Sequence, residues 1–398
     1  MWFRAFLGAW TLLLTALFGW LASHGSSGAI VFHKYSPGYF LLLLAVAGLI
    51  ALTLLAQSAF LYSRLYRIRR EIILTLTAIF FSLMMAEVAT RVFDPLGISY
   101  FEESTRYQLD MISDPALGYK HAPNLRRVYQ GVEVSTNQFG LRDREIEPKQ
   151  TGEFRILLLG DSVTFGWGVP IEATFGRRLE NLLTTKLKRP VRAINSGVGG
   201  YNTVQEYAVL KQLAGTVDPD MVVLLYVRND IQSNDPSLNP ETELTLHGKT
   251  PPEVILILAG KSWLYRLCWF ALRYSRAPSS ATLDENARGV KESLEALSGI
   301  AVLCRNRGLR FVTFYYRPLI DAASVPPLAN QLFAAIENIG RRYGFPVIDV
   351  GKWWGELDSR SLTNSTVDRH HNARGHEILA ARMANVLLER GIVNRSWP

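Results

Sequence analysis

Long, uninterrupted hydrophobic runs dominate the N-terminal part of the chain. Residues 5–23 and residues 36–63 contain no charged side chain, and a third run, residues 72–93, is interrupted by Glu87. A helix needs about 20 apolar residues to span a bilayer, and the third run reaches that length only if Glu87 and Arg91 lie near the interface. We therefore expect three transmembrane helices. A cleaved signal peptide is the alternative for the first run, and a re-entrant or interfacial helix for the third.

From residue 154 onward, short apolar runs alternate with longer amphipathic ones. The short runs predict strands at residues 154–159, 191–195, 221–227, 309–316 and 346–350. Helical periodicity predicts helices at residues 173–187, 203–214, 284–307, 326–343 and 373–390. This alternation is typical of a parallel sheet with helices on both faces. The predicted fold class is therefore α/β, with three layers.

These patterns also predict the organisation of the chain. We expect a membrane anchor over residues 1–93, an extended connecting region over 94–151 and the α/β domain over 152–398. The connecting region is rich in turn-forming residues, and only residues 128–136 alternate well enough for a strand. After its third strand the α/β domain is interrupted by an insertion, residues 231–283. A loop of that length inside a compact domain is usually functional.

The insertion begins as a polar loop and then contains an aromatic segment. Trp263, Leu267, Phe270 and Tyr274 share one face at helical spacing. Aromatic faces mostly pack against protein cores, so we expect a helix that caps the α/β domain. The alternative is a lid, or a foot that rests on the bilayer.

Positive charges beside the hydrophobic runs predict the orientation in the membrane. The link between the first two runs contains a single lysine, Lys34, whereas the link between the second and third contains Arg64, Arg67, Arg69 and Arg70. Because arginine-rich links stay in the cytoplasm, we expect the N-terminus inside and everything after Phe93 in the periplasm or the extracellular space. If residues 72–93 do not span the bilayer, the α/β domain instead faces the cytoplasm.

The formal net charge of +8 does not indicate a nucleic-acid partner. No basic stripe with interleaved aromatic residues is present, and part of the arginine excess lies beside the predicted membrane helices. Attraction to anionic lipids explains that excess more simply. The two cysteines are too few for a disulfide framework or a metal site, and we expect neither a metal nor a cofactor.

Candidate chemistry lies at the ends of the predicted strands. Strand 154–159 leads into Gly-Asp-Ser at residues 160–162, which places a serine hydroxyl at the carboxyl edge of the sheet, where α/β proteins bind ligands. A serine needs a base to act as a nucleophile. Far downstream, Asp368, His370 and His371 precede the last predicted helix. Serine, histidine and aspartate are the components of an acyl-transfer site.

Two further motifs lie between the serine and the histidines. A glycine-rich stretch, residues 195–203, follows the second predicted strand, and Val-Arg-Asn-Asp at residues 227–230 follows the third. In this order, the four motifs of residues 152–391 resemble the SGNH/GDSL hydrolase family. The Gly-x-Ser-x-Gly elbow of the α/β-hydrolases is absent, because residue 164 is threonine. Residues 137–143, Asn-x-x-Gly-Leu-Arg-Asp, are similar to a stretch that often precedes the serine block in membrane-anchored relatives, and the sequence assigns it no chemistry.

The resemblance implies a flavodoxin-like order of the sheet and roles for individual residues. Ser162 would be the nucleophile, and Asp368 would orient the histidine that serves as its base. The backbone N–H groups of Ser162 and Gly200 and the side-chain amide of Asn229 would donate hydrogen bonds to an oxyanion. The third motif departs from the family pattern, because Val227 stands where a glycine is usual.

Two spacings give different answers for the histidine. Counting forward from Asp368, as in relatives with Asp-x-x-His, selects His371. Counting back from Asn372 selects His370, which gives the Asp-x-His of relatives that modify exopolysaccharides. We favour His370, because the start of the last helix fixes the frame, and leave His371 as the alternative. His376 lies inside that helix and is expected to be structural.

The expected function is that of a membrane-anchored serine esterase or deacetylase, which cleaves O-acyl esters, chiefly acetyl esters, through an acyl-serine intermediate. One alternative is an O-acyltransferase, which moves the acyl group from the same acyl-serine onto an envelope or exported glycan. A second alternative is a non-catalytic binding module of an envelope assembly. The expected partners are an acyl-ester substrate, which a glycan could carry, and the lipid bilayer. The sequence indicates no oligomeric state.

Overall fold

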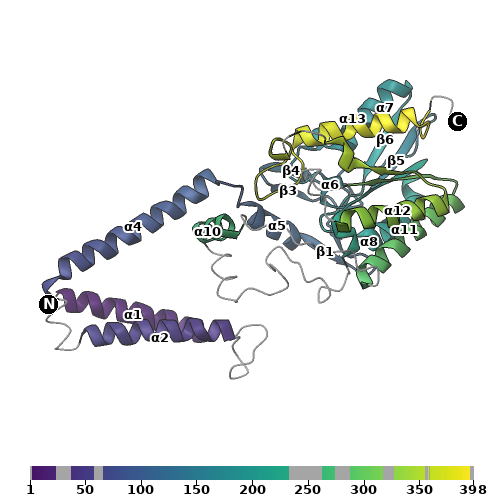
Figure 1. Cartoon of the computed structure of the whole chain (residues 1–398). Coiled ribbons are helices and arrows are strands. Elements are labelled where there is room, and N and C mark those ends of the chain that lie inside the picture. Colours follow the sequence, from purple (N-terminus) through teal and green to yellow (C-terminus); the bar gives the residue numbers. More distant parts are fainter. Residues whose placement is uncertain are drawn as a thin grey trace. The chain divides into compact units, whose positions relative to one another are not determined.

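In the computed structural model, the chain forms two compact units (Figure 1). One comprises residues 1–95 and 240–276, and the other comprises residues 96–239 and 277–398. The structure describes residues 2–23, 37–57, 66–232, 262–273, 287–316, 327–354, 357 and 359–394. Each unit is described by itself below.

The first unit is helical. It contains α1 (Trp2–Ser23), α2 (Pro37–Ala56), α4 (Arg69–Phe93) and α10 (Trp263–Arg273). Helices α1 and α2 pack together through the buried side chains of Leu21, Leu43 and Val46. A hydrogen bond of 3.1 Å from the Thr11 hydroxyl to the Thr53 hydroxyl adds a polar contact between them.

Two helices in the described residues are long and apolar enough to cross a membrane. They are residues 4–23 and 69–93, and only 6% and 0% of their most apolar windows are buried within the protein. The core helix of a soluble protein would be mostly buried, whereas the apolar surfaces of these two helices are exposed within the protein. The apolar part of α2, Phe40–Ala56, is shorter. The anchor of three spanning helices stays a prediction.

Helix α10 lies in the aromatic segment of the insertion and packs against α4. The Glu87 carboxylate accepts hydrogen bonds from the Ser262 hydroxyl (2.8 Å) and from the backbone N–H groups of Trp263 and Leu264 (2.9 Å each). The first N–H groups of a helix have no intrahelical acceptor, and a carboxylate satisfies them. We expected a helix that caps the α/β domain, and its packing on α4 departs from that expectation. Most of the remaining insertion lies outside the described residues.

The second unit is built on one five-stranded parallel sheet. Its strand order is β6-β5-β7-β8-β9, the flavodoxin-like order. The strands are β5 (Phe154–Leu159), β6 (Val191–Asn195), β7 (Met221–Tyr226), β8 (Arg310–Tyr315) and β9 (Val347–Asp349). The predicted strands are therefore confirmed to within one residue at each end, and so is the predicted fold class.

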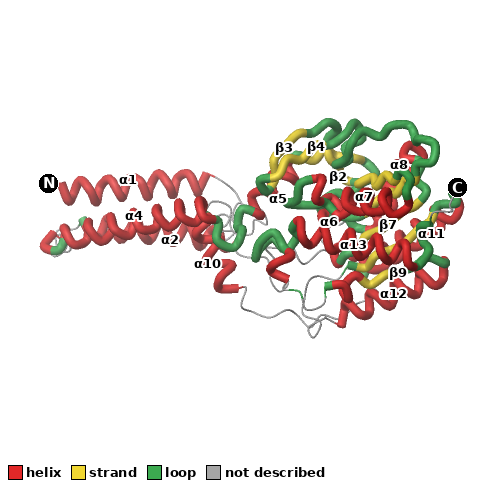
Figure 2. Tube along the Cα trace, turned by 90° about the horizontal axis from the view of Figure 1, so that it is seen from above, coloured by secondary structure: helices red, strands yellow, loops and turns green. Residues whose placement is uncertain are grey.

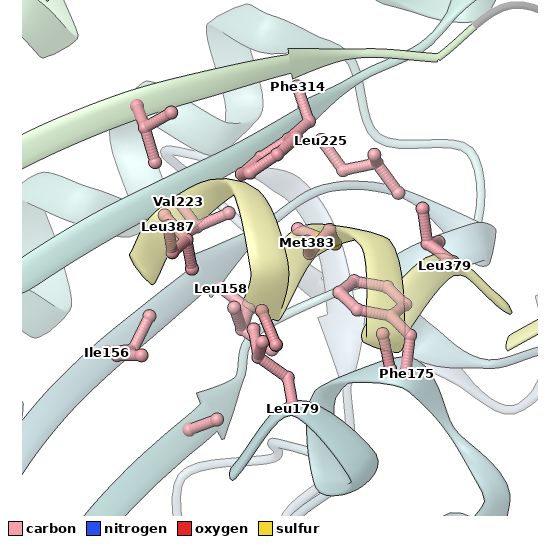
Figure 3. Close-up of a cluster of buried hydrophobic side chains, with 14 of the residues drawn as sticks. Ile156, Leu158, Phe175, Leu179, Val223, Leu225, Phe314, Leu379, Met383 and Leu387 are labelled. Atoms are coloured by element: carbon pink, nitrogen blue, oxygen red, sulfur yellow. The ribbon is translucent and has the colours of Figure 1, made fainter. Parts of the chain in front are cut away.

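Helices cover both faces of this sheet (Figure 1). On one face α7 (Phe175–Leu187) and α13 (Ala373–Glu389) pack together, and on the other lie α8 (Thr203–Val217), α11 (Arg288–Asn306) and α12 (Pro327–Tyr343). Successive side chains of a strand point to opposite faces. Ile156 and Leu158 accordingly pack with Leu179 of α7 and Met383 of α13 (Figure 3), whereas Leu157 packs on the α8 side.

Residues 96–149, which we call the collar, belong to the same compact unit as the sheet. The collar contains α5 (Tyr100–Leu109) and two antiparallel hairpins, β1 (Met111–Asp114) with β2 (Gly118–His121) and β3 (Arg126–Tyr129) with β4 (Val132–Ser135). Strand β3 lies beside α5 (Figure 2).

The second hairpin corrects the single strand that we predicted over residues 128–136. The chain reverses at Gln130 and Gly131, whose φ angles are 52° and 70°. Two consecutive positive φ angles are those of a type I′ turn, which favours glycine and connects strands directly. The sequence signal was weak, because glutamine is uncommon at the first of these positions. The domain boundary at residue 151 stays a prediction.

Candidate active site

The candidate nucleophile stands at the carboxyl end of β5, the strand next to the sheet edge formed by β6. Every residue of β5 is buried, and Ser162 opens the short helix α6 (Ser162–Phe165) three residues after Leu159, where the strand ends. Asp161 caps this helix, because its Oδ1 accepts a hydrogen bond of 2.9 Å from the Val163 N–H. Its Oδ2 lies 3.3 Å from the Ser162 hydroxyl oxygen. The strand and the cap together fix the position of the serine.

The candidate base comes from the loop before α13. The Nε2 atom of His370 lies 2.7 Å from the Ser162 Oγ, and its Nδ1 atom lies 2.6 Å from the Asp368 Oδ1. Asn372 caps α13 by accepting hydrogen bonds from two backbone N–H groups, at 3.0 and 3.1 Å. The start of α13 therefore fixes the position of Asn372, from which the sequence spacing selects His370. Ser162, His370 and Asp368 form one hydrogen-bonded chain across 208 residues of sequence.

His371 lies elsewhere. Its ring is buried against Trp354, with ring centres 4.5 Å apart, and its Nδ1 atom lies 3.2 Å from the main-chain oxygen of Leu362. Burial lowers the pKa of His371 to about 4, so its imidazole is neutral at physiological pH. The ring of His376 stacks on Phe175 and its Nδ1 accepts the Phe175 N–H at 3.1 Å. The structure thus brings only the first of these three histidines, His370, to the serine.

A residue that the sequence analysis missed supports the carboxylate. The side-chain amide of Asn364 donates a hydrogen bond of 3.1 Å to Asp368 Oδ2 and another of 3.1 Å to the main-chain oxygen of Trp167. The backbone N–H of Asp368 donates to the Ser365 hydroxyl at 2.9 Å. An asparagine in a loop carries no distinctive signal, because its role depends on contacts far apart in sequence.

The candidate oxyanion donors lie in the other two motifs. Within the described residues, the backbone N–H groups of Ser162 and Gly200 have no hydrogen-bond acceptor. Asn229 lies in the short helix η2 (Arg228–Ile231), and its amide donates to Asp161 Oδ2 at 3.0 Å and to the Tyr201 main-chain oxygen at 3.4 Å. The amide is therefore tied to Asp161, which itself contacts Ser162.

The glycine block approaches the serine helix closely. A Cβ atom on Gly197 would lie 2.3 Å from the backbone nitrogen of Phe165, so any side chain there would push the two segments apart. The neighbouring Gly199 N–H donates to the Tyr107 hydroxyl at 2.7 Å. Tyr107 belongs to the collar, which the sequence analysis did not connect with the site.

The sequence profile of the GDSL-like Lipase/Acylhydrolase family matches residues 158–378, more than half of the chain. The chain belongs to this family. It is accordingly an ester-bond hydrolase, which argues against the alternative of a non-catalytic binding module. No curated protein matches the chain.

Several solved structures are similar to this chain at low sequence identity. An alpha/beta hydrolase, LAE5, from the metagenome of Lake Arreo, Spain, is 15% identical over 61% of this chain and 96% of its own, with a TM-score of 0.38. The acetyl xylan esterase AlAXEase is 14% identical over 59% of this chain and 100% of its own, with a TM-score of 0.37. The lipase/acylhydrolase from Enterococcus faecalis is 14% identical over 60% of this chain and 96% of its own, also at 0.37. TM-scores this low support no inference about substrate.

The departure from the family pattern at residue 227 has a simple structural explanation. Val227 has a φ of −120° and a ψ of 177°, an extended conformation that any residue adopts. Its N–H donates to the Asp230 carboxylate, which also accepts the Thr203 hydroxyl at 2.8 Å. These bonds hold the short helix that carries Asn229, and the backbone at residue 227 does not require a glycine.

Three carboxyl groups under the site are fully buried. Burial raises the pKa of Asp161, raises that of Asp230 to about 7 and raises that of Glu206 well above its usual value. Burial disfavours the charged form of each carboxyl group.

Aromatic rings enclose the histidine. The ring centres of Tyr100, from the collar, and of Trp167 lie 5.9 and 6.3 Å from that of His370. Trp167 is buried in a cluster with Tyr107, Tyr129 and Phe165. Side chains from the collar therefore build one wall of the candidate active site.

Proposed function

We propose that this family member is a membrane-anchored serine esterase that cleaves acetyl esters through an acyl-serine intermediate. The observation that carries the proposal is the continuous chain of hydrogen bonds from Asp368 through His370 to Ser162, at 2.6 and 2.7 Å. These are the distances that a nucleophile and its base require.

In the first half of the reaction, the Ser162 oxygen attacks the carbonyl carbon of the ester while its proton passes to Nε2 of His370. The Asp368 carboxylate accepts the Nδ1–H bond, fixes the tautomer and stabilises the imidazolium that forms. The tetrahedral intermediate then expels the alcohol, which takes the proton from His370. In the second half, water attacks the acyl-serine with the same histidine as base, and acid and free enzyme result.

The developing negative charge on the carbonyl oxygen would be held by the N–H groups of Ser162 and Gly200 and by the amide of Asn229. The two backbone groups have no acceptor within the described part of the chain, which supports this role. Asn229 donates to Asp161 and, at 3.4 Å, to a main-chain oxygen. The longer and weaker of these bonds would be exchanged for one to the oxyanion.

A small acyl group suits the surroundings of the base. Tyr100 and Trp167 lie close to His370, and the space behind Trp167 is filled by the other rings of its buried cluster. A long acyl chain could enter that side only by displacing packed aromatic rings, which is costly.

Hydrolysis and transfer share the acyl-serine and differ only in the acceptor. We expect the full-length protein in detergent to release acetate from 4-nitrophenyl acetate. Adding unacetylated oligosaccharides should not change this rate, because water is the acceptor. Mass spectrometry of the oligosaccharides measures transfer in the same reaction. Acetylated oligosaccharide as the main product would instead establish the acyltransferase. No turnover of acetate, butyrate or octanoate esters would contradict both.

The charges and the exposed apolar helices support an anchor that places the second unit outside the cytoplasm. Residues 4–23 and 69–93 satisfy the length and composition of spanning helices, and the four arginines just before and at the start of the second of them favour a cytoplasmic link. Three spanning helices would then leave everything after residue 93 in the periplasm or the extracellular space. This location would suit a substrate that is exported or part of the envelope.

Alkaline phosphatase fused after Pro398 is expected to be active, because it matures only outside the cytoplasm. The same reporter fused at Arg67, within the arginine-rich link, is the matched control and is expected to be inactive. Activity of both fusions in cells measures the orientation. An inactive fusion at Pro398, together with a working cytoplasmic reporter at that position, would contradict the proposed topology.

A further inference from the structure

Arg142 of the collar is the largest of the fully buried side chains in the described residues, with 1% of its surface exposed. Its Nη1 donates to the main-chain oxygens of Phe165 (3.0 Å) and Gly166 (2.6 Å), and its Nη2 donates to that of Val169 (2.8 Å). The guanidinium carbon lies 4.8 Å from the centre of the Phe165 ring. Across the described ranges it forms no ion pair.

Burying a charge without a carboxylate partner is costly. Burial lowers the pKa of Arg142 to about 10, which still leaves it protonated at neutral pH. A guanidinium offers five donors in a rigid plane, so it can bind three carbonyl groups at once. A lysine also has three donors, but they come from one nitrogen and lack this fixed plane. What the three carbonyl groups hold therefore decides the role of Arg142.

The three carbonyl groups belong to the last residue of α6 and the turn after it, which we call the loop 165–169 and which connects the nucleophile with the carboxylate. On one side, two backbone N–H groups of this loop donate to the main-chain oxygen of Ser162, at 3.0 and 3.1 Å. On the other side, the main-chain oxygen of Trp167 accepts the amide of Asn364, which also donates to Asp368. A shift of the loop would therefore move the serine relative to the carboxylate that orients its base.

The next residue, Asp143, holds the glycine block in the same way. Its Oδ2 accepts the backbone N–H of Asn195 at 2.8 Å, and its Oδ1 lies 3.0 Å from Arg192. Asn195 in turn lies within 3.5 Å of the Phe165 main-chain oxygen, which Arg142 also binds. Two consecutive collar residues thus fix the two loops against each other.

We propose that Arg142 is a positioning residue, which holds the loop 165–169 so that Ser162 meets His370 and Asp368 at reactive distances. Asp143 extends this hold to the glycine block and its oxyanion donor. The stretch 137–143, to which the sequence assigned no chemistry, thereby acquires a role in catalysis. The inference rests on the proposed function of Ser162 as nucleophile.

The test compares Arg142→Lys with Arg155→Lys in the full-length protein. Arg155 is the control, because its buried guanidinium also donates to main-chain oxygens, those of Val217 (2.9 Å) and Glu147 (2.7 Å), at the opposite end of β5. Unlike Arg142, it also pairs with a carboxylate, that of Glu153 at 2.8 Å. We expect Arg142→Lys to lower kcat for 4-nitrophenyl acetate about 100-fold, with KM changed less than about threefold, because a misplacement of 1 Å can have that effect. Arg155→Lys should lower Tm and leave kcat within about twofold.

The rate at which a fluorophosphonate labels Ser162 is the second readout, and it needs no known substrate. We expect the labelling rate to fall together with kcat in Arg142→Lys and to stay unchanged in Arg155→Lys. If the wild type is labelled and the two variants are labelled at equal rates, the positioning role is overturned. If the wild type is not labelled at all, the proposed function itself is overturned. If Arg142→Lys does not fold, Asp143→Asn is the second variant, because it leaves Arg142 in place. We expect Asp143→Asn to slow labelling about tenfold, which corresponds to the loss of about one hydrogen bond. An unchanged rate in that variant would equally overturn the inference.

Discussion

Replacing His370 by alanine is expected to remove nearly all turnover of a small acetyl ester, while replacing His371 leaves most of it. The imidazole of His370 lies 2.7 Å from the Ser162 hydroxyl, whereas that of His371 is buried against Trp354 and bonded to a main-chain oxygen. Loss of the base of a serine hydrolase lowers kcat by about 10⁶-fold. Loss of His371 should lower kcat less than about tenfold, because it removes packing and not proton transfer.

Stability must be measured alongside activity, because His371 is buried and its truncation leaves a cavity. We expect His371→Ala to lower Tm and His370→Ala to leave it nearly unchanged, the reverse of their effects on kcat. His371→Asn keeps a donor near the Leu362 oxygen and serves if the alanine variant does not fold. The opposite ranking of kcat, with both variants folded, would transfer the role of base to His371. Mild and equal losses would remove the case for a serine–histidine mechanism.

Replacing Ser162 by alanine is expected to lower kcat about 10⁶-fold as well, because the Ser162 hydroxyl is the proposed nucleophile and lies 2.7 Å from the base. The change removes one partly exposed oxygen atom, so Tm should stay within a few degrees of the wild type. Ser196→Ala is the matched control. Ser196 lies at the same edge of the sheet, but its hydroxyl donates to the main-chain oxygen of Leu158 at 2.6 Å.

We expect Ser196→Ala to reduce stability by about 1 kcal/mol, the usual contribution of a hydrogen bond, and to keep kcat within about tenfold. Steady-state kinetics with 4-nitrophenyl acetate and thermal unfolding measure both variants. Turnover by Ser162→Ala at the level of Ser196→Ala would place the nucleophile elsewhere.

The sheet could be predicted because its strands are buried on both faces. Met221–Tyr226 is an unbroken apolar run, and such runs between polar turns are typical of parallel sheets. The choice of His370 over His371 could be predicted because Asn372, from which the spacing is counted, is recognisable in the sequence as the N-cap of a helix. Both features depend on short stretches of sequence, which a single chain displays without an alignment.

The contribution of the collar could not be predicted, because it depends on contacts between distant segments. Tyr107 binds Gly199 and Arg142 binds the loop 165–169, and nothing in their local sequence identifies those partners. The packing of α10 was open for the same reason. An aromatic helix face fits a protein core or another helix equally well, and the Glu87 carboxylate at the start of α10 is a contact that only the structure displays.

The most direct test of the central claim is covalent labelling of the full-length protein with a fluorophosphonate, followed by peptide mass mapping. The serine oxygen displaces fluoride and forms a stable bond to phosphorus, so the adduct marks an activated nucleophile. We predict a single adduct, on Ser162, which is absent in Ser162→Ala and strongly slowed in His370→Ala. Ester hydrolysis by a protein that carries no adduct on Ser162, or an adduct on another residue, would contradict the account.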